Sequence, residues 1–155
     1  MNFFWDTFVP FAVLDLKTME LSKSYLKDLT YKVTGAAIEV HKRLGPGLLE
    51  SVYHKCLAKE LELREISFKS EYKIPYSYKG FDLDIELRCD FLIEDILVVE
   101  LKSVVEILPV FEAQIITYMK LLEIPKGLLI NFNVENLYYN GQKTFVNELY
   151  RSLPE

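Results

Sequence analysis

The stretch Cys89–Ser103, CDFLIEDILVVELKS, decides the fold, because it reads as two apolar strands joined by a turn at Glu94-Asp95. Side chains alternate across a strand with a period of two, so Glu100 and Lys102 share one face of the second strand. Ionised groups are almost never fully buried unless they are paired or bind a metal, because an ion is costly to desolvate. This carboxylate and this ammonium group therefore need a partner or a ligand.

Length and composition limit the classes of protein to which the chain can belong. With 155 residues, half of them apolar, it has the size of one ordinary globular domain. A net charge of -5 argues against a surface coated in positive charge, so nucleic-acid contact would need a local basic patch. Cys56 and Cys89 lack the spacing of a zinc site and fit a reduced, cytoplasmic protein in which both thiols are buried and free.

Residues 1–18 are predicted to be an N-terminal extension of undetermined role, and residues 19–155 a single domain. Asp6, Pro10 and Asp15 interrupt the apolar run, no basic residue precedes it, and it is too short to span a bilayer. We therefore expect no membrane association. Three alternatives stay open for the extension: a strand or helix packed on the domain, a partner-binding tail, or a segment upstream of a natural start at Met19. The last is favoured.

Apolar periodicity predicts the order of elements. Helical spacing and the Gly45-Pro46 stop predict a first helix, and strand alternation predicts Ile85, Leu87, Cys89, Phe91 and Ile93 on one face. Asn140-Gly141 is typical of a short hairpin. The predicted helices cover 22–44, 47–64 and 112–123; the predicted strands cover 68–74, 85–93, 96–102 and 127–133, with a C-terminal hairpin of 137–139 and 142–146.

A turn centred near Asp95 places Asp90 opposite Glu100 on the neighbouring strand. Like charges in that position repel, so the arrangement benefits from a divalent cation between them. Carboxylate oxygens without a thiol or imidazole cluster suit Mg²⁺ or Mn²⁺. Lys102 could then orient a water nucleophile or stabilise phosphate charge. The alternative is that Lys102 forms a simple ion pair with Glu100 or Asp90 at the strand end.

Two motifs give the chain a family resemblance. Asp90, nine residues, then Glu100-Leu101-Lys102 resembles the D-x(n)-ExK signature of the PD-(D/E)XK nuclease superfamily. GLLESVY at Gly47–Tyr53 resembles the motif that names the GxxExxY protein family, a branch of that superfamily. The resemblance extends over residues 29–146 and includes GAAIEVHKRLGPG at 35–47, YKG at 78–80 and GLLINFN at 127–133.

The resemblance implies an α/β fold with a PD-(D/E)XK nuclease-like core. A mixed central β-sheet would be flanked by helices in the order α-α-β-β-β-α-β, followed by the C-terminal hairpin. Asp90 and Glu100 would bind Mg²⁺ or Mn²⁺, Glu50 would complete the metal site, and Lys102 would be the catalytic lysine. For Glu50 the alternative is a purely structural role, since a glutamate in the first turn of a helix is favoured by the macrodipole.

Gln114 and Tyr118 lie four residues apart on one helix face and resemble the QxxxY element of recombination-type members of the superfamily. The resemblance implies that they and Tyr53 support the site or contact nucleic acid; the alternative is a surface glutamine and a core tyrosine. Family members often carry a histidine before that glutamine, and here Phe111 stands in its place.

Other polar residues allow two interpretations each. His41 is expected at the surface, and His54 lies one helical turn after Glu50 but is not assigned to the site. The first helix has a basic side that either meets a phosphate backbone or is simply solvated, formed by Lys23, Lys27, Lys32, Lys42 and Arg43.

The sequence thus predicts a cytoplasmic, metal-dependent nuclease that hydrolyses phosphodiester bonds in DNA or, as the less favoured substrate, RNA. The alternative is a non-catalytic nucleic-acid or protein interaction module that keeps the nuclease fold. A plain structural domain is the third and least favoured interpretation. A homodimer is left open, because no residue pattern decides the oligomeric state.

Overall fold

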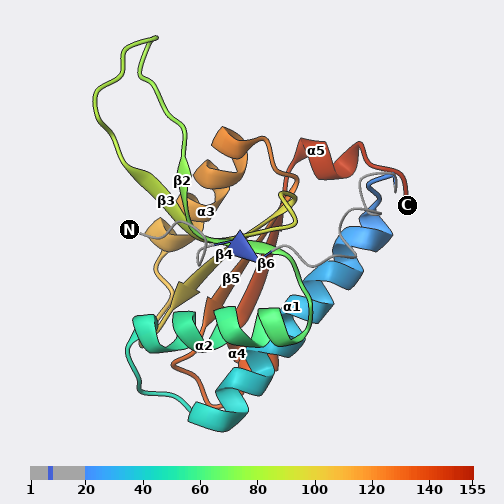
Figure 1. The fold of residues 1–155 in the computed structure, drawn as a ribbon, viewed down its shortest axis with the longest axis vertical. Coiled ribbons are helices and arrows are strands. Elements are labelled where there is room, and N and C mark those ends of the chain that lie inside the picture. The colour runs from blue at the N-terminus through green and yellow to red at the C-terminus, as the bar shows by residue number, and fades with distance from the viewer. Residues whose placement is uncertain (1–6, 9–19) are drawn as a thin grey trace.

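The computed structural model describes residues 7–8 and 20–155, which form a mixed sheet with helices on both faces (Figure 1). The strands are β1 (Thr7–Phe8), β2 (Phe68–Ile74), β3 (Leu87–Ile93), β4 (Leu97–Lys102), β5 (Lys126–Asn131) and β6 (Gln142–Val146). They lie in the order β1-β2-β3-β4-β5-β6, and only β4 and β5 pair in parallel. The predicted α/β class with a mixed central sheet is confirmed.

Two helices cover one face of the sheet. Helix α1 (Lys23–Leu44) begins after Ser22, whose hydroxyl accepts a hydrogen bond from the Tyr25 amide, and it ends at Gly45 with φ at 70°. Helix α2 (Glu50–Leu63) packs against α1 and across the sheet. Together they bury the larger apolar cluster, whose strand residues include Phe91, Ile93, Val99, Leu101, Leu128 and Ile130.

Helix α3 (Pro109–Leu122) connects the parallel strands β4 and β5 and covers the opposite face. Pro109 occupies the first turn, where the missing amide costs no hydrogen bond. A second apolar cluster joins α3 to the sheet through Val98, Leu129, Ile115 and Met119. Alternation along β4 therefore places Glu100 and Lys102 on the α3 side.

The decisive hairpin forms as predicted. Strands β3 and β4 pair antiparallel with Ile93 opposite Leu97 and Phe91 opposite Val99. Glu94 and Asp95 are the central residues of the turn that the hydrogen bond from the Ile96 amide to the Ile93 carbonyl oxygen closes, and both have positive φ, at 50° and 58°.

The predicted single alternation along residues 85–93 is wrong. Phe91 and Ile93 pack in the cluster under α1 and α2, but Cys89 and Leu87 pack in the cluster under α3. The exchange of faces occurs at Asp90, where the opposing Glu71 has a positive φ of 48° and drops out of the β2–β3 pairing. Strand β3 also begins at Leu87 rather than Ile85. A local backbone twist therefore moves the two halves of the strand to different cores.

The predicted C-terminal hairpin is also wrong. Residues Leu137–Asn140 form the short helix α4, and β6 pairs with β5 instead of with this segment. The Asn136 side chain accepts a hydrogen bond from the Tyr139 amide and so starts a helical turn. Gly141 follows because a Cβ there would lie 2.7 Å from the Asn131 carbonyl oxygen. A final short helix, α5, covers Glu148–Arg151.

The remaining predicted boundaries shift by a few residues. Helix α2 begins three residues later than predicted, because Gly47 has a φ of 95° and belongs to the preceding loop. Helix α3 begins three residues earlier than predicted, at its proline.

Only Thr7 and Phe8 of the predicted N-terminal extension are among the described residues. They form β1 and pair with Lys69 and Phe68 at the edge of β2. The predictions for the rest of residues 1–18 and for a start at Met19 lie outside the described residues. Within residues 20–155, no helix is both long and apolar enough to cross a membrane.

Candidate nuclease site

Asp90 and Glu100 lie at the open end of the β3–β4 hairpin, where each carboxylate accepts a hydrogen bond from an amide of the opposite strand. The register that pairs Phe91 with Val99 places them opposite each other, as predicted. Here side chains replace main-chain pairing: the Asp90 amide donates to Glu100 Oε1 at 2.9 Å, and the Leu101 amide donates to Asp90 Oδ2 at 2.7 Å. The two carboxylates therefore occupy the space where the strands separate, and the hairpin itself fixes their positions.

Glu100 is only 4% exposed, which makes its charge costly. Burial, and then repulsion from Asp90, raise the pKa of the Glu100 carboxyl to about 8. The Asp90 amide and the Lys102 charge oppose this rise. In the absence of a cation, the site therefore favours a proton on Glu100 near neutral pH.

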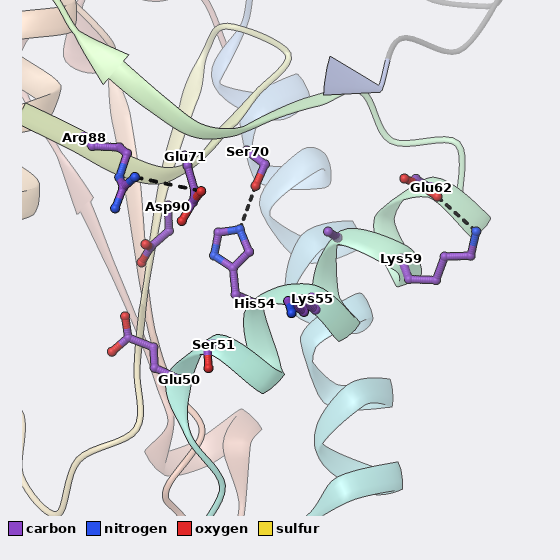
Figure 2. Close-up of a pocket in the computed structure, with 11 residues that line it drawn as sticks. Glu50, Ser51, His54, Lys55, Lys59, Glu62, Ser70, Glu71, Arg88 and Asp90 are labelled. Carbon is purple, nitrogen blue, oxygen red and sulfur yellow. Dashed lines mark hydrogen bonds and ion pairs between the residues drawn. The ribbon is translucent and has the colours of Figure 1, made fainter. Parts of the chain in front are cut away.

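Glu50 reaches the same site from the first turn of α2. Burial raises the pKa of its carboxyl, the charge of Asp90 adds to the rise, and the charge of Lys102 counteracts it. Figure 2 shows the carboxylates of Glu50 and Asp90 pointing toward each other from α2 and β3. The four predicted residues thus lie near one another, since the charges of Asp90 and Lys102 act on both Glu50 and Glu100.

Tyr53 holds the loop that positions Glu50. Its hydroxyl donates to the Gly45 carbonyl oxygen at 2.6 Å and accepts from the Leu48 amide at 3.1 Å. The ring is fully buried and stacks on Phe132 with centroids 4.4 Å apart. A buried ring cannot contact a nucleic acid, so of the two predicted roles only support of the site fits. The motif Gly47–Tyr53 therefore combines a glycine with positive φ, an acidic site residue and the anchor of the loop.

Lys102 is half-buried and forms no ion pair within residues 20–155, so the predicted alternative of a pair with Glu100 or Asp90 is wrong. Its Nζ atom lies 4.6 Å from the centroid of the Phe111 ring, within the range of a cation–π interaction. Phe111, which stands where family members often carry a histidine, is thus the residue that contacts Lys102.

Gln114 and Tyr118 lie on the α3 face that covers the site. Gln114 Nε2 donates to the Tyr118 hydroxyl at 3.0 Å. Tyr118 is 6% exposed; burial raises its pKa, and the nearby charge of Glu100 adds to the rise. Tyr118 is therefore a core tyrosine that lies close to the acidic site, and Gln114 fixes its hydroxyl.

Sequence reasoning missed Asn131, the parallel neighbour of Lys102 at the end of β5. Its buried side chain donates to the Val104 carbonyl oxygen and accepts from the Val104 amide, at 2.9 and 3.1 Å. The segment after Lys102 is thereby tied to β5. The position of an asparagine at the end of a buried strand beside the ExK strand was the available signal.

An open groove of about 670 Å³ leads away from Glu50 and Asp90 between α2 and the strands β2 and β3. Figure 2 shows its lining. His54, which sequence reasoning left unassigned, lies in it with Nε2 2.6 Å from Ser70 Oγ. Arg88 and Lys55 also line it and were not singled out from the sequence.

Two further expectations are settled by burial. His41 is not a surface residue: it is 9% exposed, and its Nε2 lies 2.7 Å from the Val134 carbonyl oxygen. Both cysteines are free, as predicted, but only Cys89 is buried; the prediction of a buried thiol is wrong for Cys56, which is partly buried. Burial raises the pKa of the Cys89 thiol to about 12, so this sulfur stays protonated.

The donors of the site are the hard oxygen ligands that a divalent cation takes. The raised pKa values of Glu50 and Glu100 come first from burial and then from the charge of Asp90, and a bound cation would offset both. Among residues 20–155, however, no three His, Cys, Asp or Glu side chains already stand as the ligands of one metal ion. The donor chemistry fits a metal, because Asp90 and Glu100 each use one carboxylate oxygen for the amide hydrogen bond and keep the other oxygen for a cation.

Comparison with protein families identifies the class. The model of the PD-(D/E)XK nuclease superfamily matches residues 27–143, which include every candidate site residue. The chain belongs to this superfamily, whose nucleases generally use divalent metal ions. No curated protein and no solved structure matched significantly.

Proposed function

We propose that the chain is a metal-dependent nuclease that hydrolyses phosphodiester bonds in DNA, with RNA as the less favoured substrate. The observation that carries this proposal is the meeting of three carboxylates and one lysine where β3 and β4 separate. Two of the carboxylates have raised pKa values, which is typical of functional sites. Within the GxxExxY branch, to which we assign the chain on the Gly47–Tyr53 motif, Glu50 completes this set.

Asp90, Glu100 and Glu50 would hold Mg²⁺ or Mn²⁺. The cation would lower the pKa of a bound water and so supply a nucleophile at neutral pH. The protein contributes the geometry: the hairpin register aligns Asp90 with Glu100, and the loop anchored by Tyr53 brings Glu50 to them.

Lys102 would orient the attacking water and stabilise the negative charge that grows on the phosphate. Support comes from its place on the same strand face as Glu100 and from its lack of an ion pair within the described domain, which leaves the ammonium group available to substrate. Gln114 and Tyr118 would support Glu100 from α3. We further propose a cytoplasmic location and leave a homodimer as an option that could span a duplex.

The test is cleavage of labelled single- and double-stranded DNA and RNA with Mg²⁺, Mn²⁺ or EDTA. We expect metal-dependent cutting that Lys102→Ala reduces by about 10²- to 10³-fold, the effect of removing one group that stabilises the transition state. Lys120→Ala, an exposed lysine on α3, is the matched control and should leave cutting unchanged.

A folded, metal-loaded protein that cuts none of the four substrates would contradict the proposal. It would favour the alternative of an interaction module that keeps the nuclease fold.

A further inference from the structure

We propose that the groove between α2 and strands β2 and β3 binds the backbone of a single-stranded nucleic acid next to the scissile phosphate. This inference rests on the proposed nuclease function and names the form of its substrate. The groove begins at Glu50 and Asp90 and continues along α2 as far as Glu62. A nucleic-acid strand whose phosphate lies at the carboxylates can therefore continue along this groove.

The walls of the groove bear on whether one strand or two can enter it. Its walls are a helix and the sheet on which that helix packs, and its volume of about 670 Å³ lies within the ~300–1,000 Å³ range of small-ligand sites. A duplex cannot enter between a helix and its own sheet and could touch only the rims. A flexible single strand can follow the floor.

The lining contains the acids Glu50, Glu62, Glu71 and Asp90 beside the bases Lys55, Lys59 and Arg88, so donors for phosphodiester oxygens stand only at particular positions. Lys55 forms no ion pair within the described domain, and Arg88 is held only by a loose 3.9 Å contact with Glu71 that a phosphate could replace. The imidazole of His54 is fixed between Ser70 and the ring of Phe91, on which it stacks at 4.3 Å. Its position is therefore set before any ligand arrives.

The opposite rim of the site is apolar, which also favours unpaired nucleic acid. Leu49 is 75% exposed and Val105 94% exposed, and their two loops are joined by a hydrogen bond from Ser103 Oγ to the Leu48 carbonyl oxygen. The faces of unpaired bases can bury apolar surface against such aliphatic residues, whereas a duplex presents its charged backbone.

The test measures binding by fluorescence anisotropy in EDTA, where cleavage cannot contribute. Labelled single-stranded DNA is compared with the same sequence as a duplex. Lys55→Ala/Arg88→Ala is compared with Lys32→Ala/Lys42→Ala, which removes the same charge from the exposed basic side of α1.

We expect tighter binding of the single strand than of the duplex. The groove variant should lower the slope of log affinity against log salt by about 0.7 for each lost phosphate contact, and the α1 variant should not. Leu49→Asp should weaken the single strand only.

Duplex binding that equals or exceeds single-strand binding would overturn the inference, as would an equal loss in the α1 variant. If the single strand binds through the groove but is never cut with Mg²⁺ or Mn²⁺, the nuclease proposal fails while the groove assignment stands. If only duplexes are cut, the nuclease proposal stands and the groove assignment fails.

Discussion

The hydroxyl of Tyr53 and the carbonyl oxygen of Gly45 lie 2.6 Å apart, so a residue on the second turn of α2 determines where that helix begins. The same hydroxyl accepts a hydrogen bond from the Leu48 amide, so one oxygen atom holds both Gly45 and Leu48 of the loop. Glu50 follows this loop directly. The acidic residue of the motif is consequently positioned by its tyrosine.

Tyr53→Phe should destabilise the protein by about 1–3 kcal/mol, because it leaves the Leu48 amide and the Gly45 carbonyl without their buried partner. Cleavage activity should fall as well, because Glu50 loses its fixed approach. Chemical denaturation and cleavage rates measure the two effects. Tyr139→Phe, at a 79% exposed tyrosine, is the control; equal stability of both variants would contradict the anchoring role.

Asp90→Ala should abolish the binding of Mg²⁺ and Mn²⁺ in isothermal titration calorimetry, and Glu50→Gln should weaken it, since both would remove carboxylate ligands. Asp95→Ala is a matched control from the turn of the same hairpin, where the carboxylate pairs with Lys69 at 2.7 Å and lies away from the site. Cation binding that survives Asp90→Ala would refute the ligand assignment.

The stability of the metal-free protein should fall as pH rises from about 4.5 to about 8. In this window the folded state keeps a proton on Glu100 that the unfolded chain has released, so each rise in pH favours unfolding. Glu100→Gln keeps the shape and hydrogen-bonding capacity of the protonated acid and should flatten the decline. Denaturant midpoints in EDTA at several pH values measure it. A parallel decline in wild type and Glu100→Gln would show that another group causes it.

Phe111→Leu should slow cleavage by about twofold to thirtyfold, equivalent to ~0.5–2 kcal/mol for a cation–π contact with Lys102. Phe111→Tyr keeps an aromatic face and should retain the rate. Binding of single-stranded DNA in EDTA should be the same in both variants, because Phe111 contacts Lys102 and does not line the proposed groove. A rate that falls equally in Phe111→Leu and Phe111→Tyr would exclude the aromatic ring as the cause.

The hairpin and its opposed carboxylates were predictable, because the turn at Glu94-Asp95 and the apolar strands fix the register to within one residue. The helices were predictable from periodicity and from Gly45. In contrast, the exchange of faces at Asp90 depends on a positive φ at Glu71, a residue with no sequence signal for that conformation. Likewise Asn140-Gly141 suits a hairpin turn and a helix end equally, and only the Asn136 cap and the close approach to Asn131 decide between them.

The site was predicted less completely than the fold. Asp90, Glu100, Lys102 and Glu50 could be named because two motifs carry them. The role of Tyr53 as anchor, the contact of Lys102 with Phe111 and the tie from Asn131 to Val104 all depend on tertiary packing between segments far apart in the chain. Local sequence patterns do not record such packing.

The exchange of faces along β3 places Asp90 between two strand segments that pack in different apolar clusters. On one side of it the strand is held by the apolar cluster of α1 and α2, and on the other by the cluster of α3. Asp90 thus lies at the boundary between two cores, and we expect a change of side-chain volume in either core to shift the same carboxylate. Substitutions in either apolar cluster can therefore change the position of the Asp90 carboxylate without replacing any residue of the site.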